Sequence, residues 1–487
     1  MRQHARSRSL LICALPLVMQ RIARYCFRNS VGRTAPLRLR ESTTWRILLA
    51  VVVCVSLITD PKCCAAEDQT TTWADSHPEL LEIFGHPFMP QGIEHRDRFP
   101  TWPSVTHTAN LPASQPSVVL ANSGDLFANC GSWIARSNDG GRTWQNAGKP
   151  PRTGEIPSGS VLMLNSLDGC GVTHNGTILA HYALQHNDGR PYEGLSDPSY
   201  HIDLYVIRST DGGQTWQQPF RLNAAPTENA GAHRTRFFHM PDGAIALAMG
   251  TWFQSSSGPL PEAERYVRSF IWRSSDDGKI WHRDRKPFCL YGAEPDLLVL
   301  PSGRILASVR YQRHKLPHDP KELASPHRMR NDSPPYADSK RVGVGLVARN
   351  TAVLHSDDGG KSWTDPRIVT GFDEQTGCLV RLSDGTVILV FGHKTDRRGQ
   401  RFMLSYDEGE TWSRTVYNLG IGGLYASSVV LSDGTIVTVS DRSADGGSYF
   451  QAIRWTPPSR DEVSKKGFWR PRVAEPLGKR VSANTSE

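Results

Sequence analysis

Short apolar runs alternate with turn sequences along most of the chain. One example is the run at 296–300, which is followed by the turn Pro301-Ser302-Gly303 and by a second run at 304–309. Apolar runs on both sides of a glycine-containing turn are typical of β-hairpins. The pattern occurs six times, and its turns are Asn122-Ser123-Gly124, Asn175-Gly176, Pro241-Asp242-Gly243, Pro301-Ser302-Gly303, Ser383-Asp384-Gly385 and Ser432-Asp433-Gly434. The chain is therefore predicted to be all-β.

A second pattern, Ser-x-Asp-x-Gly-x-Thr-Trp, lies between these hairpins, and we call its copies the Trp turns. Their aspartates are Asp139, Asp211, Asp276, Asp358 and Asp407, and consecutive copies start 72, 65, 82 and 49 residues apart. The third copy has Ile280 and the fourth has Ser362 in place of threonine. Asp and Ser can hydrogen-bond the turn amides, Gly supplies a positive φ and Trp packs against the hairpin. We interpret these turns as structural and not catalytic.

Six hairpins and five Trp turns predict a six-bladed β-propeller with four-stranded antiparallel blades. Each hairpin supplies strands one and two, and each Trp turn joins strands three and four. Blade six has only a degenerate turn (Ser443, Asp445, Gly447) before the strand at 449–455. Its missing strand is expected from the N-terminal side, at roughly residues 80–106, which would leave no free sheet edge.

Charge and hydropathy separate a leader from the rest of the chain. Residues 1–66 carry 11 Lys/Arg and 2 Asp/Glu, so a total net charge of +8 leaves −1 for the remainder. This balance gives no reason to expect nucleic-acid binding. The apolar run at 47–58 precedes Cys64-Ala65-Ala66, as in a secretory signal cleaved near Ala66. An uncleaved anchor is the alternative, although twelve residues are short for a membrane span.

The predicted domains are the leader (1–66), an N-terminal extension that supplies the closing strand (67–106), the propeller (107–456) and a C-terminal tail (457–487). We expect a periplasmic or extracellular protein without a stable membrane span in the mature chain. The cysteines after the leader are Cys130, Cys170, Cys289 and Cys378. Their spacing fits no metal site, and buried free thiols are favoured over a disulfide. No metal or organic cofactor is expected.

The candidate chemistry lies at the propeller face opposite the turns, where strand one starts, strand two ends and strand three starts. Glu294 precedes strand one of blade four, and Arg310 ends strand two of that blade. Arg397 and Arg401 precede or start strand three of blade five, and Tyr425 starts strand one of blade six. A few polar groups that converge in one mouth are the usual signature of a ligand site.

These residues resemble the sialidase (neuraminidase) superfamily with Asp-box, or BNR, repeats, over roughly residues 107–456. The resemblance implies a retaining exo-glycosidase that removes terminal sialic acid or a related acidic sugar from glycans. It implies Tyr425 as the nucleophile and Glu294 as its base, because a carboxylate nucleophile would be repelled by the sugar's own carboxylate. It also implies that Arg310, with Arg397 or Arg401, binds that carboxylate.

Blade one departs from the family pattern. Ser114 stands where the family's first triad arginine is expected, and the connection at 129–132 lacks the expected acid/base aspartate. Groups that could substitute are Glu193, Asp197, His233 and Arg234. Two alternatives therefore stay open: a non-catalytic glycan-binding propeller, and a hydrolase or lyase of another polysaccharide. In each case the expected partner is a glycan, and the oligomeric state is open.

Overall fold

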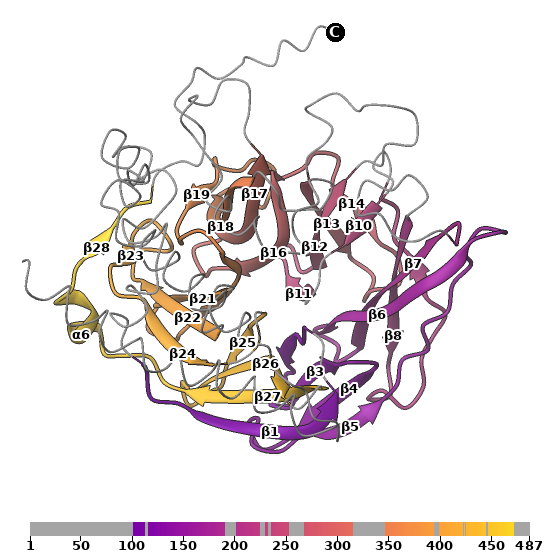
Figure 1. Cartoon of the computed structure of the whole chain (residues 1–487), viewed down its shortest axis with the longest axis horizontal. Helices are drawn as coiled ribbons and strands as arrows, with labels where there is room; N and C mark the ends of the chain where they lie inside the picture. The colour runs from indigo at the N-terminus through magenta and orange to yellow at the C-terminus, as the bar shows by residue number, and fades with distance from the viewer. Residues whose placement is uncertain are drawn as a thin grey trace, which may run out of the picture. The chain divides into compact units, whose positions relative to one another are not determined.

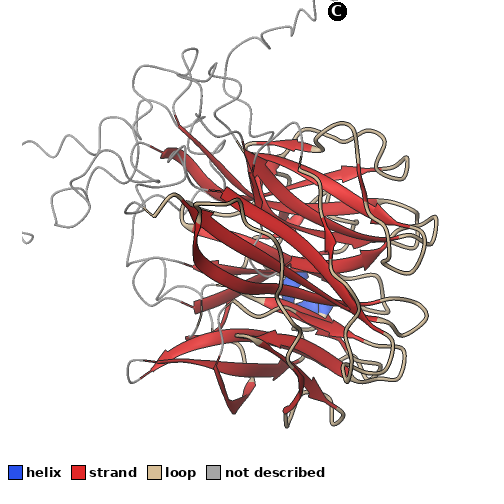
Figure 2. Cartoon of the chain, turned by 90° about the vertical axis from the view of Figure 1, so that its right-hand side faces the viewer, coloured by secondary structure: helices blue, strands red, loops and turns tan. Residues whose placement is uncertain are grey.

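The computed structural model describes residues 101–112, 115–189, 201–224, 229–231, 235–252, 267–314, 346–393, 399–421, 423, 425–444 and 447–471. The chain divides into two compact units, Met1–Thr71 and Thr72–Glu487, and every described residue belongs to the second. The predicted leader therefore lies outside the described residues. Strands dominate the described part, as Figure 2 shows, so the all-β prediction is confirmed. Within this part, no helix is long and apolar enough to cross a membrane.

The described strands form four four-stranded sheets, one ten-stranded sheet and one two-stranded sheet (Figure 1). We divide the ten-stranded sheet at its parallel pairing and number the resulting six antiparallel groups along the chain. Group one contains β2 (Val118–Leu120), β3 (Leu126–Cys130), β4 (Trp133–Ser137) and β5 (Gln145–Gly148). Group two contains β6 (Val161–Val172), β7 (Ile178–Asn187), β8 (His201–Ser209) and β9 (Phe220–Arg221). Group three contains β10 (Asn229–Gly231), β11 (Thr235–His239), β12 (Ile245–Trp252), β13 (Arg268–Ser274), β14 (His282–Arg283) and β15 (Cys289–Leu290).

The second half of the unit repeats this arrangement. Group four contains β16 (Gly292–Val299), β17 (Ile305–His314), β18 (Leu346–Ser356) and β19 (Arg367–Ile368). Group five contains β20 (Glu374–Arg381), β21 (Val387–His393), β22 (Gly399–Ser405) and β24 (Tyr417–Ile421). Group six contains β25 (Ser427–Val430), β26 (Ile436–Ala444), β27 (Gly447–Trp455) and β1 (Val105–Pro112). The C-terminal residues add α6 (Arg460–Ser464) and β28 (Phe468–Trp469), which pairs with β23 (Trp412–Ser413).

The first strands of the six groups contact one another in a closed circle. β2 contacts β6, β6 contacts β11, and the series continues through β16, β20 and β25 back to β2. One of these contacts is a short parallel pairing between β11 and β6, which merges groups two and three into one ten-stranded sheet. The first strands therefore share one central region, where residues distant in sequence meet.

Group six takes its fourth strand from the N-terminal side of the chain. β1 pairs antiparallel with β27, and the paired residues begin at Val105. Most of the expected range, 80–106, lies outside the described residues. The degenerate turn around Ser443 was misplaced, because Ser443 pairs with Ser448 and Ala444 with Gly447. These residues belong to the hairpin between strands two and three, at the opposite end of β27 from a Trp turn.

An ion pair in the central region joins four groups. Arg236 in β11 binds Asp296 in β16 through two hydrogen bonds, Nε–Oδ1 at 2.8 Å and Nη2–Oδ2 at 2.7 Å. The same guanidinium donates to the carbonyls of Leu379 in β20 and Ser428 in β25. Burial lowers the pKa of Arg236, but the charge and hydrogen bonding of Asp296, together with Cys378, raise it, and the net direction is upward. This pair fixes the strands that also carry the candidate site.

The Trp turns form the hydrogen bonds predicted from their sequence. In the first turn, Ser137 Oγ donates to Asp139 Oδ1 at 2.8 Å, and Gly141 N donates to Ser137 Oγ at 2.8 Å. Trp144 Nε1 donates to the Gly141 carbonyl at 3.2 Å. The equivalent glycines of all five turns have φ between 83° and 92°, where other residues are strained. The turns are thus closed structural units.

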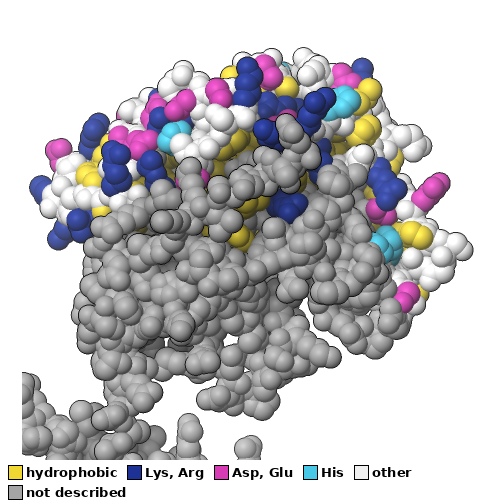
Figure 3. Space-filling view, turned by 90° about the horizontal axis from the view of Figure 1, so that it is seen from above, with side chains coloured by type: hydrophobic (Ala, Val, Ile, Leu, Met, Phe, Trp, Pro, Cys, Tyr) yellow, Lys and Arg dark blue, Asp and Glu magenta, His cyan; other side chains and the backbone are white. Residues whose placement is uncertain are grey.

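The four described cysteines, Cys130, Cys170, Cys289 and Cys378, are buried, and no disulfide joins any two of them. Burial raises the pKa of the first three thiols to about 12, so they are poor nucleophiles. On the face shown in Figure 3, basic and acidic side chains of the described residues are intermixed rather than segregated into one basic patch.

Candidate functional site

Glu294 lies at an interruption in the pairing of β16 with β17. The register passes from Ala293↔Arg310 to Asp296↔Ser308, so Glu294 and Pro295 form a β-bulge. Glu294 has a φ of +45°, which is unusual for a residue other than glycine. Its side chain is 8% exposed. Backbone strain of this kind is concentrated at functional sites, because bulges turn side chains out of the regular alternation.

The Glu294 carboxylate connects groups four and six. Its Oε1 accepts a hydrogen bond from Arg310 Nη1 at 2.8 Å and one from Tyr425 Oη at 3.3 Å. Burial lowers the pKa of Arg310, but the nearby Glu294 and Tyr425 raise it, and the net direction is upward. Three residues singled out from the sequence are thus in direct contact, although the chain separates Glu294 from Tyr425 by 131 residues.

A second arginine, missed in the sequence, belongs to the same assembly. Arg349 in β18 lies opposite Gln312 of β17, and its Nε is 3.2 Å from Asp373 Oδ1. Burial lowers the pKa of Arg349, Asp373 raises it, Arg310 lowers it, and the net direction is downward. Glu294 and Asp373 each raise the pKa of both arginines, so we assign the two guanidinium groups to one charged assembly. We call Glu294, Arg310, Arg349, Asp373 and Tyr425 the Glu-Arg-Tyr cluster, and the strand ends that carry it the site face.

Arg401 belongs to a different buried group. Its Nη1 contacts Glu374 Oε1, and His393 Nδ1 lies 3.4 Å from the same oxygen. Burial raises the pKa of Glu374, but Arg401 and then His393 lower it to about 2. Arg401 is 3% exposed and is thus enclosed within group five. Arg397 lies outside the described residues, so the binding roles assigned to Arg397 and Arg401 stay predictions.

Group one lacks the two expected family residues, but an arginine lies beside the gap. Arg152 Nη2 donates to Ser132 Oγ at 2.8 Å. Burial lowers the pKa of Arg152, whereas Asp168 and Tyr182 raise it, and the net direction is downward. Asp168 is 6% exposed and sits at a bulge in β6. The residues Ser114, Glu193, Asp197, His233 and Arg234 lie outside the described part of the chain.

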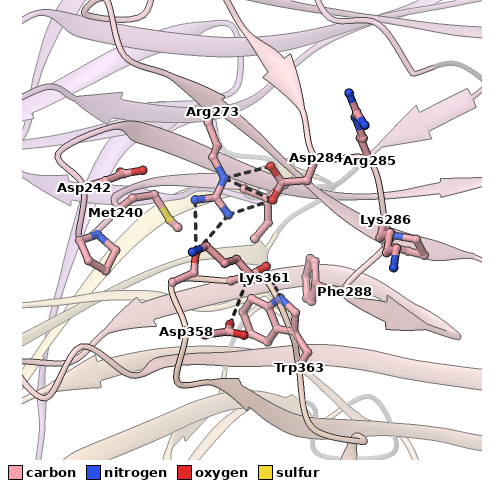
Figure 4. A pocket seen from close by; sticks show the side chains of 15 residues that line it. Met240, Asp242, Arg273, Asp284, Arg285, Lys286, Phe288, Asp358, Lys361 and Trp363 are labelled. Carbon is pink, nitrogen blue, oxygen red and sulfur yellow. Dashed lines mark hydrogen bonds and ion pairs between the residues drawn. The ribbon is translucent and has the colours of Figure 1, made fainter.

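A cavity of about 720 Å³ lies beside the fourth Trp turn (Figure 4). Three of its charged side chains have partners within the cavity wall, because Arg273 binds Asp284 in a fork and Asp358 accepts bonds from its own turn. The turn begins at Ser356, at the other end of β18 from Arg349, or about 23 Å away at 3.3 Å per residue. This cavity is therefore separate from the Glu-Arg-Tyr cluster, which contains the convergent reactive groups.

A family model for the BNR/Asp-box repeat matches residues 207–218, which is the second Trp turn. The chain thus contains an Asp-box repeat. This confirms the resemblance predicted from the five turns. Among its described residues, no group of His, Cys, Asp or Glu is arranged to hold a metal ion. No curated protein sequence matches the chain.

Several solved structures are similar to the chain at low sequence identity. A Dyadobacter fermentans protein of unknown function has a TM-score of 0.50 and 18% identity, over 72% of this chain and 97% of the other. Trypanosoma rangeli sialidase has a TM-score of 0.47 and 13% identity, over 74% of this chain and 58% of the sialidase. NanB sialidase from Streptococcus pneumoniae has a TM-score of 0.47 and 11% identity, over 77% of this chain and 73% of NanB. The chain thus spans about three-fifths of the T. rangeli protein, and the first similarity concerns the fold alone.

Proposed function

We propose that the six strand groups are the blades of a six-bladed β-propeller whose site face carries the Glu-Arg-Tyr cluster. Two features support this architecture. The first strands of the groups contact one another in a closed circle, and β1 completes group six from the opposite end of the chain. Radial repetition of sheets leaves only short, protected inner edges, which favours a stable all-β domain.

We further propose that the protein is an exported exo-glycosidase that removes terminal sialic acid or a related acidic sugar. The observation that carries this proposal is the contact between Tyr425 Oη and Glu294 Oε1 at 3.3 Å. An ordinary phenol has a pKa near ~10, so a tyrosine nucleophile requires an adjacent base. Glu294 would accept the phenol proton while the oxygen bonds to the anomeric carbon, which gives a retaining mechanism.

The two arginines account for the acidic substrate. Arg310 favours the ionised form of Glu294, which a general base requires. Arg310 and Arg349 are 16% and 22% exposed, so both are largely desolvated but reach the surface of the described residues. Guanidinium groups bind planar carboxylates through two parallel hydrogen bonds. A sugar carboxylate placed over these arginines would bring its anomeric carbon toward Tyr425.

A glycan-binding protein without turnover is the second candidate. It is favoured by the connection between β3 and β4, where the family's acid is missing. Asn129, the residue at its start, is fully buried and accepts hydrogen bonds from Ser117 N and Oγ at 2.6 and 2.8 Å. Its amide also donates to the carbonyl of Leu167, so its role is structural.

The test is an assay of the full chain on a panel of fluorogenic glycosides, sialosides included, beside Tyr425→Phe. We expect sialoside cleavage and a loss of at least about 100-fold in the variant, because the attacking oxygen is removed. Tyr406→Phe, a tyrosine that packs on Phe468 near the fifth Trp turn, is the matched control. Cleavage of a different glycoside, and not of sialosides, would show that the substrate belongs to another class of glycan. Binding on a glycan array without any cleavage would establish the second candidate.

A further inference from the structure

Asp441 in β26 lies against the segment that carries the proposed nucleophile. The pairing of β25 with β26 begins at Ser427↔Val439, two residues after Tyr425. Before this pairing, the chain at Gly423 lies against Asp441, because a Cβ added there would overlap the carbonyl oxygen and Oδ1 of Asp441. The segment that delivers Tyr425 is therefore packed on Asp441.

The strand alternation directs Asp441 toward group one. Val439 packs in one cluster with Val118 and Leu126 of group one. Ser427, opposite Val439, accepts a hydrogen bond from Val118 N at 3.1 Å. Side chains two positions apart on a strand share a face, so Asp441 is on the same face as Val439. Its carboxyl group is thus at the site-face end of group six, on the side where the expected acid of group one is missing.

The surroundings of Asp441 favour its protonated form. Oδ1 is buried and has no hydrogen-bond partner among the described residues, while Oδ2 accepts one bond from Ser448 Oγ at 3.3 Å. The residue paired with Asp441 in β27 is the apolar Phe450. Burial raises the pKa of Asp441 above its usual range and outweighs its hydrogen bonds. A carboxyl group of this kind can donate a proton near neutral pH.

We propose that Asp441 is the general acid/base of the glycosidase reaction, an inference that rests on the function proposed above. In the first step, Tyr425 Oη bonds to the anomeric carbon, the glycosidic C–O bond breaks and the Asp441 proton passes to the leaving oxygen. In the second step, the Asp441 carboxylate accepts a proton from water, whose oxygen bonds to the anomeric carbon. The tyrosyl C–O bond breaks, and Tyr425 recovers its proton from Glu294.

The experiment compares Asp441→Asn with the wild-type full chain on two glycosides of one acidic sugar. One substrate carries an aryl leaving group, which departs without protonation, and the other carries a second sugar, which does not. We expect kcat/KM to fall at least about 100-fold on the disaccharide and less than about 10-fold on the aryl glycoside. The control is Asp433→Asn, in the turn between β25 and β26, which we expect to retain activity on both.

The outcomes separate the two proposals. A wild-type protein that cleaves neither substrate would overturn the glycosidase function and, with it, the role of Asp441. The wild-type protein could also cleave both substrates while Asp441→Asn loses activity equally on the two or loses none. That result would overturn the role of Asp441 and leave the glycosidase function intact. If Asp441→Asn does not fold, Asp441→Glu gives the same comparison, since it keeps a carboxyl group at a displaced position. Selective loss on the disaccharide supports the proposal, and equal loss contradicts it.

Discussion

The fourth Trp turn and the Glu-Arg-Tyr cluster lie at opposite ends of one strand and are built in opposite ways. β18 carries both, with Arg349 near one end and Ser356 at the other. Each turn satisfies its hydrogen bonds within a few residues, as Asp139 does with Thr143 and Arg142. The cluster joins residues from three groups. The residues that recur in every Trp turn therefore maintain the fold, whereas the candidate catalytic residues do not recur from group to group.

Backbone strain distinguishes the cluster from the fourth Trp turn, although the third and fifth Trp turns hold Asp277 and Glu408 at φ of +64° and +55°. In the fourth turn the positive φ of +90° falls on Gly360, where it costs little. In the cluster a positive φ of +45° falls on Glu294, whose side chain is needed. A residue held in this region costs about 1–3 kcal/mol and persists only where the surrounding structure enforces it. Glu294 therefore differs from Gly360 in carrying, at a positive φ, a side chain that contacts both Arg310 and Tyr425.

The largest effect is expected from Glu294→Gln. We expect kcat to fall at least about 100-fold, because an amide cannot accept the Tyr425 proton. Single-turnover kinetics on the best substrate of the panel would measure it. The matched control is Glu410→Gln at the fifth Trp turn, where Glu410 binds Arg304 and Arg367 at 3.1 and 2.9 Å. The control should lose stability but keep kcat, and an equal loss of kcat in both would remove the distinction between the two regions.

A smaller effect is expected from Arg310→Lys and Arg349→Lys. Lysine keeps the charge but loses the planar fork, so we expect kcat/KM on an acidic glycoside to fall about 10- to 100-fold in each. Arg304→Lys, on the turn side of the molecule, should leave kcat/KM unchanged. Calorimetric titration of each variant with the free acidic sugar would show whether the variant binds that sugar more weakly than the wild type. Unchanged binding in both site variants would exclude the arginines as carboxylate ligands.

The sequence predicted the turns more completely than the site for a physical reason. A Trp turn closes within eight residues, so its residues alone determine its hydrogen bonds. Glu294, Arg310 and Tyr425 could be predicted because each starts or ends a strand and because they resemble a known family. Arg349 and Asp441 could not, since their neighbours depend on strand register. Nothing in the apolar strand before the fourth Trp turn distinguishes Arg349 from a solvated side chain.

The closing strand shows the same limit on the scale of the fold. A strand from the N-terminal side was expected because a free sheet edge is unfavourable. The range could not be determined, since Val105-Thr106-His107-Thr108 alternates like any first strand of a blade. Only the pairing of Val105 with Arg454 distinguishes an outer strand of group six from the start of group one.

A modest loss of stability is expected from Asp139→Ala in the first Trp turn. The change removes the acceptors of Thr143 Oγ1 and of two turn amides, so we expect about 1 kcal/mol less free energy of unfolding. Asp139→Asn keeps one acceptor oxygen and should cost less. Urea unfolding would measure both variants. Glycosidase activity should be unchanged, and a drop in kcat would show that the turns affect the cluster.

The smallest effect is a pH dependence that originates in the same turn. Burial raises the pKa of Asp139, but bonds from Thr143 and Ser137 lower it to about 2. A carboxyl group whose folded pKa is depressed stabilises the fold above its unfolded pKa, near ~4, and this stabilisation is lost as pH falls through the folded pKa. Wild-type stability in urea should thus decrease between pH ~4 and ~2 more steeply than that of Asp139→Ala. Parallel curves would show that the turn hydrogen bonds are equally strong with a protonated carboxyl group, so that its charge contributes nothing to the fold.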